Sequence, residues 1–116
     1  MELVALLSSG EGTWSQVSGL IKQGQWDKII ILGSAFAKKF EHEKKFEFIQ
    51  VDLNRRLVEL KRDFLENLKQ KIHGTEVALT IASGNGKEHM ALISALLSIP
   101  TGIRFVALTK DGIIFL

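Results

Sequence analysis

The feature that most constrains the fold is a strand–turn–helix unit between Val77 and Leu97. It consists of a continuous apolar run, a short turn of glycine and small polar residues, and an amphipathic helix. An apolar run without alternation is typical of a parallel strand that is covered on both faces. The turn, Ser83-Gly-Asn-Gly-Lys87, would lie at the carboxyl edge of such a sheet, where ligands of α/β proteins bind. This one unit therefore predicts both a fold class and the place of a site.

The rest of the chain repeats the same alternation. Apolar runs predict strands, amphipathic or charged segments predict helices, and the Asp111-Gly112 pair between two β-prone runs predicts a hairpin. We expect strands at 3–7, 28–32 and 47–51, helices at 13–23, 35–43 and 53–73, and hairpin strands at 104–109 and 113–116. The prediction is one α/β domain over residues 1–116, a Rossmann-like parallel sheet of about four strands. Helices should cover both faces, and the C-terminal β-hairpin should lie at the edge.

Two of the helices carry more specific expectations. The helix at 53–73 has leucines and other apolar residues at three- and four-residue spacing, Asp52 as a good cap, and Gly74 as its end. In the helix after the glycine-rich turn we expect the apolar side chains to lie in the core; these are Met90, Leu92, Ile93, Leu96 and Leu97.

Composition excludes several classes of protein. The 116 residues fit one domain, the lack of cysteine excludes disulfides and thiolate metal sites, and the formal charge of +2 is too small to indicate nucleic-acid binding. The three histidines do not follow zinc spacing. No apolar run reaches the ~20 residues that span a bilayer, and the N-terminus lacks the basic start of a signal peptide. We therefore expect a cytoplasmic protein with no metal, no cofactor, no membrane contact and no direct binding of DNA or RNA.

Three turns supply the candidate ligand-binding residues. Each follows a predicted strand, and the carboxyl ends of parallel strands meet at one edge, where free N–H groups at a helix start favour an anion. The candidates are Ser9, Gly10, Gly33, Ser34, Ser83, Gly84, Asn85, Gly86 and Lys87. Turn geometry alone could also explain these small polar residues. Glu88 is structurally favoured near a helix start and needs no function to explain it.

Familiar enzyme motifs are absent. Gly86-Lys87 lacks the earlier glycine of a P-loop, Gly10-Glu-Gly12 is only a fragment of G-x-G-x-x-G, and there is no G-x-S-x-G elbow. No pair of carboxylates stands out as a general acid and base. Catalytic residues therefore remain unassigned, with Lys87 as the one candidate.

The segment Ser83-Gly-Asn-Gly-Lys-Glu-His-Met90 resembles a motif of the CARF family, the CRISPR-associated Rossmann-fold domains. In that family a strand runs into a Thr-Gly-Gly-Thr-Lys-x-Met-like turn and then an apolar helix. The first strand with its Ser-Gly turn and the second strand with Ile30-Ile-Leu-Gly-Ser34 follow the same order, so the resemblance covers nearly the whole chain. This chain departs from the motif in having Asn85 for a glycine and two residues, not one, between Lys87 and Met90.

The resemblance implies a stand-alone domain that senses a cyclic oligoadenylate, a nucleotide second messenger of CRISPR-associated antiviral defence. In the family the ligand lies across the twofold axis of a homodimer. Two alternatives stay open at this stage. One is a metal-independent ring nuclease that cleaves such a ligand, with Lys87 stabilising the developing charge. The other is a non-catalytic dimerisation or interaction module.

Overall fold

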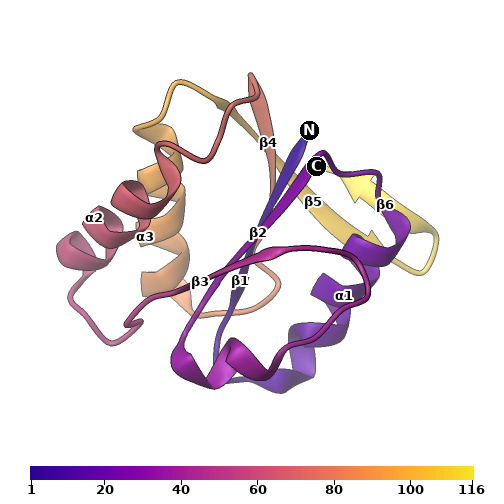
Figure 1. The fold of residues 1–116 in the computed structure, drawn as a ribbon, viewed down its shortest axis with the longest axis horizontal. Coiled ribbons are helices and arrows are strands. Elements are labelled where there is room, and N and C mark those ends of the chain that lie inside the picture. The colour runs from indigo at the N-terminus through magenta and orange to yellow at the C-terminus, as the bar shows by residue number, and fades with distance from the viewer.

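The computed structural model describes residues 1–116, which form a six-stranded sheet in the order β3-β2-β1-β4-β5-β6 (Figure 1). The strands β1 to β5 pair in parallel, and β6 pairs antiparallel to β5. The strands are β1 (Glu2–Leu7), β2 (Lys28–Gly33), β3 (Glu47–Gln50), β4 (Glu76–Thr80), β5 (Gly102–Thr109) and β6 (Gly112–Phe115).

Helices lie on both faces of this sheet. One face carries α1, and the other carries α2 and α3, which pack side by side (Figure 1). The three α-helices are α1 (Trp14–Gln23), α2 (Leu57–Leu68) and α3 (Gly86–Leu97), and two short 3₁₀ turns are η1 (Glu11–Thr13) and η2 (Ala35–Lys39). None of these helices has both the length and the apolar character needed to cross a membrane.

The strand order places a topological switch point between β1 and β4. From β1 the chain moves outward to β2 and β3, and it then returns through α2 to β4 on the other side of β1. Open α/β sheets form their ligand crevice at such a point, outside the carboxyl ends of the strands. The α/β class and the helices on both faces are confirmed, and the arrangement is compatible with a Rossmann-like fold.

The expected number of strands is wrong. The sheet has six strands instead of about four, because the first arm of the predicted edge hairpin is β5, which continues the parallel sheet by pairing with β4. The Lys110–Gly112 turn does connect two antiparallel strands, and β6 lies at the edge of the sheet.

The continuous apolar runs are explained by a core on each side of the sheet. All six residues of β1 are buried. Val4 and Leu6 pack with α2 and α3, whereas Leu3, Ala5 and Leu7 pack on the α1 side. Since successive side chains of a strand point to opposite faces, the five apolar residues of β1 alternate between the two cores.

Glu2 is a charged residue at the start of this central strand, and it is only 6% exposed. Its carboxylate accepts hydrogen bonds from the backbone N–H groups of His73 and Gly74 at 3.0–3.1 Å. These bonds satisfy the buried charge and connect the start of β1 to the loop that precedes β4.

The helix predicted at 53–73 is shorter at both ends. At its start, Asp52 forms a turn of its own, because its carboxylate accepts from the N–H of Asn54 at 3.0 Å and its carbonyl from the N–H of Arg55. Aspartate side chains compete with helix formation in this way. At the other end, α2 stops at Leu68 and a tighter turn brings Ile72, 7% exposed, into the core.

Two further expectations are corrected. The helix predicted at 35–43 is only the 3₁₀ turn η2, which ends at Lys39. Met90 and Leu97, predicted to lie in the core, are 58% and 70% exposed because they lie on the outer side of α3.

Candidate functional site

Two clefts lie next to each other at the carboxyl edge of the sheet. We call the first the β3 cleft; it has a volume of about 470 Å³ and is lined by Ser8, Ser9, Ser34, Ala35, Phe36, Gln50, Val51, Asp52, Leu53, Asn54 and Glu88. We call the second the switch-point cleft; it has a volume of about 440 Å³ and is lined by Ser8, Ser9, Gly10, Gly12, Thr13, Ala82, Ser83, Gly84 and Asn85. Both volumes are within the 300–1,000 Å³ of typical ligand pockets. Because Ser8 and Ser9 line both clefts, the two form one groove across the ends of β4, β1, β2 and β3.

The switch-point cleft is held together by a bond between its two turns. The hydroxyl of Ser83, which is 2% exposed, accepts a hydrogen bond from the N–H of Ser8 at 2.9 Å. On the other side, the indole N–H of Trp14 donates to the carbonyl of Ser8 at 3.1 Å. The end of β1 is thus fixed by a residue from each neighbouring turn, which makes the cleft a preformed feature of the fold.

Gly84 forms the sharp turn from β4 into α3. Its φ of +109° is a conformation that favours glycine. A Cβ at this position would lie 2.6 Å from Cδ2 of Leu6 and 2.9 Å from Oε1 of Glu88, so there is no room for a side chain. The glycine lets the turn pass close over the core, and its backbone forms part of the cleft wall.

The start of α3 has two satisfied and two free backbone N–H groups. Asn85 and Glu88 form a capping box, in which each side chain accepts a hydrogen bond from the other residue's N–H, at 2.9 and 3.0 Å. The capping box leaves the N–H groups of Gly86 and Lys87 without a partner in the protein. Free N–H groups at the positive end of a helix are the usual protein contribution to an anion site.

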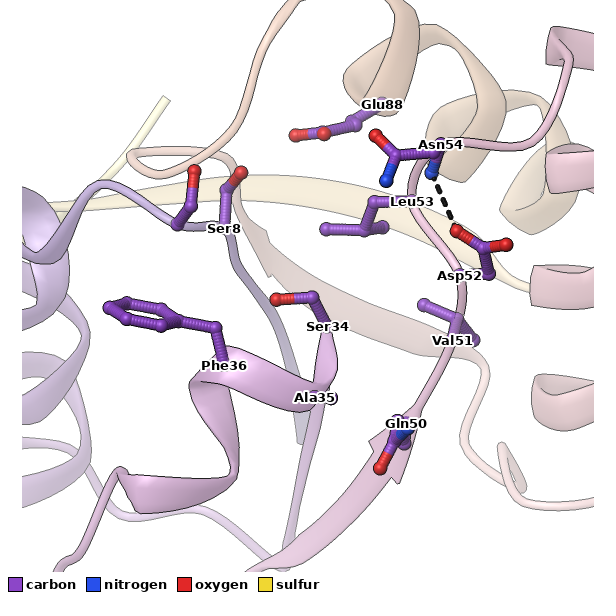
Figure 2. Close-up of a pocket in the computed structure, with 11 residues that line it drawn as sticks. Ser8, Ser34, Ala35, Phe36, Gln50, Val51, Asp52, Leu53, Asn54 and Glu88 are labelled. Carbon is purple, nitrogen blue, oxygen red and sulfur yellow. Dashed lines mark hydrogen bonds between the residues drawn. The ribbon is translucent and has the colours of Figure 1, made fainter.

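The β3 cleft has an apolar wall and polar groups that face each other. In Figure 2 the side chains of Leu53 and Ser34 point into the space between the strand ends, and the Glu88 carboxylate extends over it from α3. Asp52 turns away from this space and accepts its bond from Asn54 instead. The Ser34 hydroxyl oxygen is buried and has no hydrogen-bond partner.

Lys87 does not face either cleft. Its ammonium group donates to the carbonyl oxygens of Leu53 and Arg55 at 2.9 and 2.8 Å. These residues precede α2, and Leu53 forms part of the β3 cleft. The Lys87 ammonium therefore connects the start of α3 to the segment before α2, and its charge is engaged by these two carbonyl oxygens.

Six of the nine predicted ligand residues line the groove: Ser9, Gly10, Ser34, Ser83, Gly84 and Asn85. Three do not: Gly33, Gly86 and Lys87. Gly33 is buried, and a Cβ there would lie 2.7 Å from the carbonyl oxygen of Leu7. Close packing of β2 against β1 is sufficient to explain this glycine.

Sequence reasoning missed the third wall of the groove. Phe36, Gln50, Leu53 and Asn54 line the β3 cleft although no motif marks them. Glu88, which lies within the CARF-like segment but is not among the predicted ligand residues, lines it as well. The available signal was topological: Gln50 ends a parallel strand, so the residues after it must reach the same edge as the two glycine-rich turns. The capping box alone explains why a glutamate stands at position 88, so nothing in the sequence indicated that its side chain lies in the cleft.

The charges of the groove are unusual for an anion site. Neither cleft has a lysine, arginine or histidine among its lining residues, whereas the β3 cleft has Asp52 and Glu88. The ring nitrogen Nε2 of His89 is within 2.8 Å of the carbonyl oxygen of Ser83 and thus is engaged with the turn. No three His, Asp or Glu side chains gather into a group that could hold a metal ion.

An apolar groove of about 430 Å³ adjoins the switch-point cleft, with Ala82 lining both. It lies at the ends of β4 and β5 and is lined mainly by apolar residues, among them Ile81, Phe105, Leu108 and Leu116. Leu116 is 75% exposed, so this part of the surface is left uncovered by the chain itself.

A scan against models of known protein families finds no match, and no curated protein matches the chain significantly. The ligand is therefore inferred from the residues that line the two clefts and from the sequence of the turns after β1 and β4.

Proposed function

We propose that this chain is a CARF-like domain that binds a cyclic oligoadenylate along the carboxyl edge of its sheet, as a homodimer in the cytoplasm. The observation that carries the proposal is the continuous groove at the switch point, where the turns after β1 and β4 meet through the Ser8–Ser83 bond. This is where open α/β sheets bind nucleotides. The CARF-like motif includes one of these two turns.

Backbone groups would bind the phosphates in this proposal. The N–H groups of Gly86 and Lys87 are free at the start of α3, next to the wall that Gly84 and Asn85 form. With no cationic side chain in the cleft, a phosphate would depend on these dipoles and on serine hydroxyls. Such a site favours moderate affinity for a phosphodiester over tight capture of a free phosphate dianion.

The uncovered apolar surface supports the homodimer. Met90 and Leu97 on α3, and Ile114 and Leu116 at the C-terminus, are 40–75% exposed. Ile114 pairs with Ala107, on the face of the sheet that α2 and α3 cover. Exposed large apolar side chains often mark protein interfaces, and twofold dimers are the commonest soluble oligomers.

The edge strand β6 adds to this argument. Its sequence Gly-Ile-Ile-Phe has no charge, and its outer side has no strand partner. The opposite edge strand, β3, carries Glu47, which forms an ion pair with Lys71. Proteins usually protect edge strands with charges of this type, so the uncharged edge at β6 favours coverage by a second copy.

Binding is better supported than cleavage. The ring-nuclease alternative needs a cation close to the reacting phosphate, and Lys87, the candidate, donates its ammonium hydrogens to two carbonyl oxygens. The third alternative, a pure interaction module, leaves the polar groove unexplained.

The experiment is calorimetric titration of the protein with cyclic tetra-adenylate and cyclic hexa-adenylate, followed by chromatography of the ligand. We expect saturable binding of one of them and an intact ligand afterwards. A Gly12→Phe variant would obstruct the switch-point cleft without disturbing the fold, since nothing lies within 4 Å of a Cβ at Gly12. Gln23→Phe, an exposed position on α1, is the matched control.

The Gly12→Phe variant should lose binding and Gln23→Phe should keep it. No heat of binding with either ring, or equal binding by the two variants, would contradict the proposal. Linear products after incubation would favour the ring nuclease instead.

A further inference from the structure

We propose that the β3 cleft receives the nucleoside part of the ligand, with its base against Leu53 and Phe36 and one of its hydrogen-bond donors on Glu88. The phosphate remains at the switch-point cleft. This inference rests on the proposed function and adds to it the orientation of the ligand and the residues that select a nucleoside.

Glu88 is the first observation. Its side chain is almost completely enclosed, with the residue 5% exposed, yet only one carboxylate oxygen has a partner: Oε1 accepts from the N–H of Asn85. The carboxylate extends over the cleft, and its other oxygen, Oε2, has no hydrogen bond within the protein. Because Oε2 is not a buried atom, it is open to the cleft, and it can accept a hydrogen bond from a ligand that enters there.

Ser34 is the second, independent observation. Its hydroxyl oxygen is the one buried side-chain nitrogen or oxygen in the chain without a hydrogen-bond partner, and the residue lines the same cleft. Unsatisfied buried polar groups are rare in folded proteins, because each one loses its hydrogen bonds to water without gaining another. A polar ligand group within reach of Ser34 would remove this cost.

Charge decides which part of a nucleotide enters. The Glu88 carboxylate extends over the β3 cleft, and no lysine, arginine or histidine is among the lining residues, so the cleft is better suited to a neutral group with donors than to a phosphate. A nucleoside has such donors in its sugar hydroxyls and, for adenine, in its amino group. The neighbouring switch-point cleft has no charged lining residue and adjoins the free N–H groups of α3, so the phosphate has a better place there.

The apolar side chains fit a base. Leu53 points into the cleft, and Phe36 keeps 45% of its surface exposed on the opposite wall (Figure 2). The edge of Trp14 lies against Phe36 at 5.8 Å between ring centroids, and the Lys39 ammonium lies 4.0 Å from the Phe36 ring. These contacts fix the phenyl ring and place the ammonium over one of its faces, so a planar base would pack on the surface of Phe36 that stays exposed. Ser8 and Ser9, shared by both clefts, would then lie beside the link between sugar and phosphate.

The test is an NMR titration of the ¹⁵N-labelled protein with adenosine and, separately, with inorganic phosphate. Adenosine should shift the amide signals of Ser34, Phe36 and Leu53, and phosphate should shift those of Gly84, Gly86 and Lys87. Adenosine shifts centred on the Gly84 turn would overturn the orientation.

The variant Glu88→Gln tests the contact, because glutamine keeps a capping box while it removes the charge. We expect adenosine to bind about tenfold more weakly to Glu88→Gln, and about threefold more weakly to Ser34→Ala, with the melting temperature of Glu88→Gln nearly unchanged. Equal adenosine affinities in the wild type and both variants would overturn the inference.

Four analogues identify the donor: purine riboside lacks the amino group, and 2′-deoxyadenosine, 3′-deoxyadenosine and 5′-deoxyadenosine each lack one hydroxyl. Loss of the Glu88→Gln effect with any one supports the contact, whereas an effect that persists with all four contradicts it. Cyclic tetra-adenylate separates the two proposals. Equal binding by the wild type and Glu88→Gln would refute only the orientation, and no binding at all would refute the proposed function as well.

Discussion

The hydroxyl of Ser83 accepts a hydrogen bond at 2.9 Å from the N–H of Ser8, a residue 75 positions earlier in the chain. Ser8 follows β1 and Ser83 lies in the turn after β4, so this bond joins the two strands on either side of the switch point. The bond fixes the distance between the two turns, and with it the width of the cleft that we assign to phosphate.

Replacement of Ser83 by alanine should destabilise the fold and widen this cleft. The N–H of Ser8 is partly buried and would be left without an acceptor, which lowers the free energy of unfolding by about 1–2 kcal/mol. Urea denaturation measures this loss. Ser15→Ala, at an exposed position on α1, is the control and should change stability by less than about 0.5 kcal/mol. Equal midpoints for the two variants would show that the hydroxyl is not needed.

Lys87→Met should lower stability and loosen the wall of the β3 cleft. Methionine keeps an apolar stem but donates no hydrogen bonds to the carbonyls of Leu53 and Arg55. We expect a loss of about 1 kcal/mol, since removing a cation from a helix start partly offsets the lost bonds. Chemical denaturation measures this loss of unfolding free energy. Lys110→Met, at an exposed lysine in the hairpin turn, is the control. A variant as stable as the wild type would show that the two hydrogen bonds of Lys87 do not contribute to stability.

Two glycines of the same turn should respond in opposite ways to alanine. Gly84→Ala places a Cβ 2.6 Å from Leu6 Cδ2 in a backbone conformation with φ of +109°, so we expect a loss of about 2–4 kcal/mol. Gly86→Ala meets nothing within 4 Å at the first position of α3 and should gain up to about 1 kcal/mol. Thermal melts of both proteins decide this, and a stable Gly84→Ala protein would contradict the described turn.

Leu97→Lys should weaken the homodimer and leave the folded monomer nearly intact. Leu97 is 70% exposed on α3, so the substitution removes little core packing but places a charge in the proposed interface. Val58→Lys on α2, where Val58 is 67% exposed, is a matched control outside that interface. Sedimentation velocity should give a higher dimer dissociation constant for Leu97→Lys alone. A wild type that sediments as a monomer at high micromolar concentration would refute the dimer itself.

The layered fold could be predicted because its signals are local. The uninterrupted apolar residues of β1 and β2 are found in strands with a core on both faces, and these patterns need no knowledge of distant contacts. The role of β5 could not be predicted in the same way. An apolar run before Asp111-Gly112 predicts a hairpin arm equally well whether or not its other side pairs with β4.

The site was predictable where glycine and serine follow strands, and not where function depends on the direction of a side chain. Lys87 follows the glycine-rich turn, but its four-carbon chain extends to Leu53 and Arg55, 34 and 32 positions away. Phe36 and Leu53 form a wall only because η2 and the loop after β3 fold back to one edge. Contacts of this kind depend on the assembled fold, which no short sequence pattern contains.

The two bonds that fix β1 also determine when this chain can fold during its synthesis. Glu2 can form its hydrogen bonds only after His73 and Gly74, 71 and 72 positions later, have been synthesised, and Ser8 can form its bond only after Ser83 has been. Ribosomes add about 5–20 residues per second, so β1 spends several seconds outside the ribosome before β4 emerges to pair with it. During that time its apolar residues can pair only with β2. A nascent chain that stops before Ser83 therefore leaves the most buried strand of the protein open on one side.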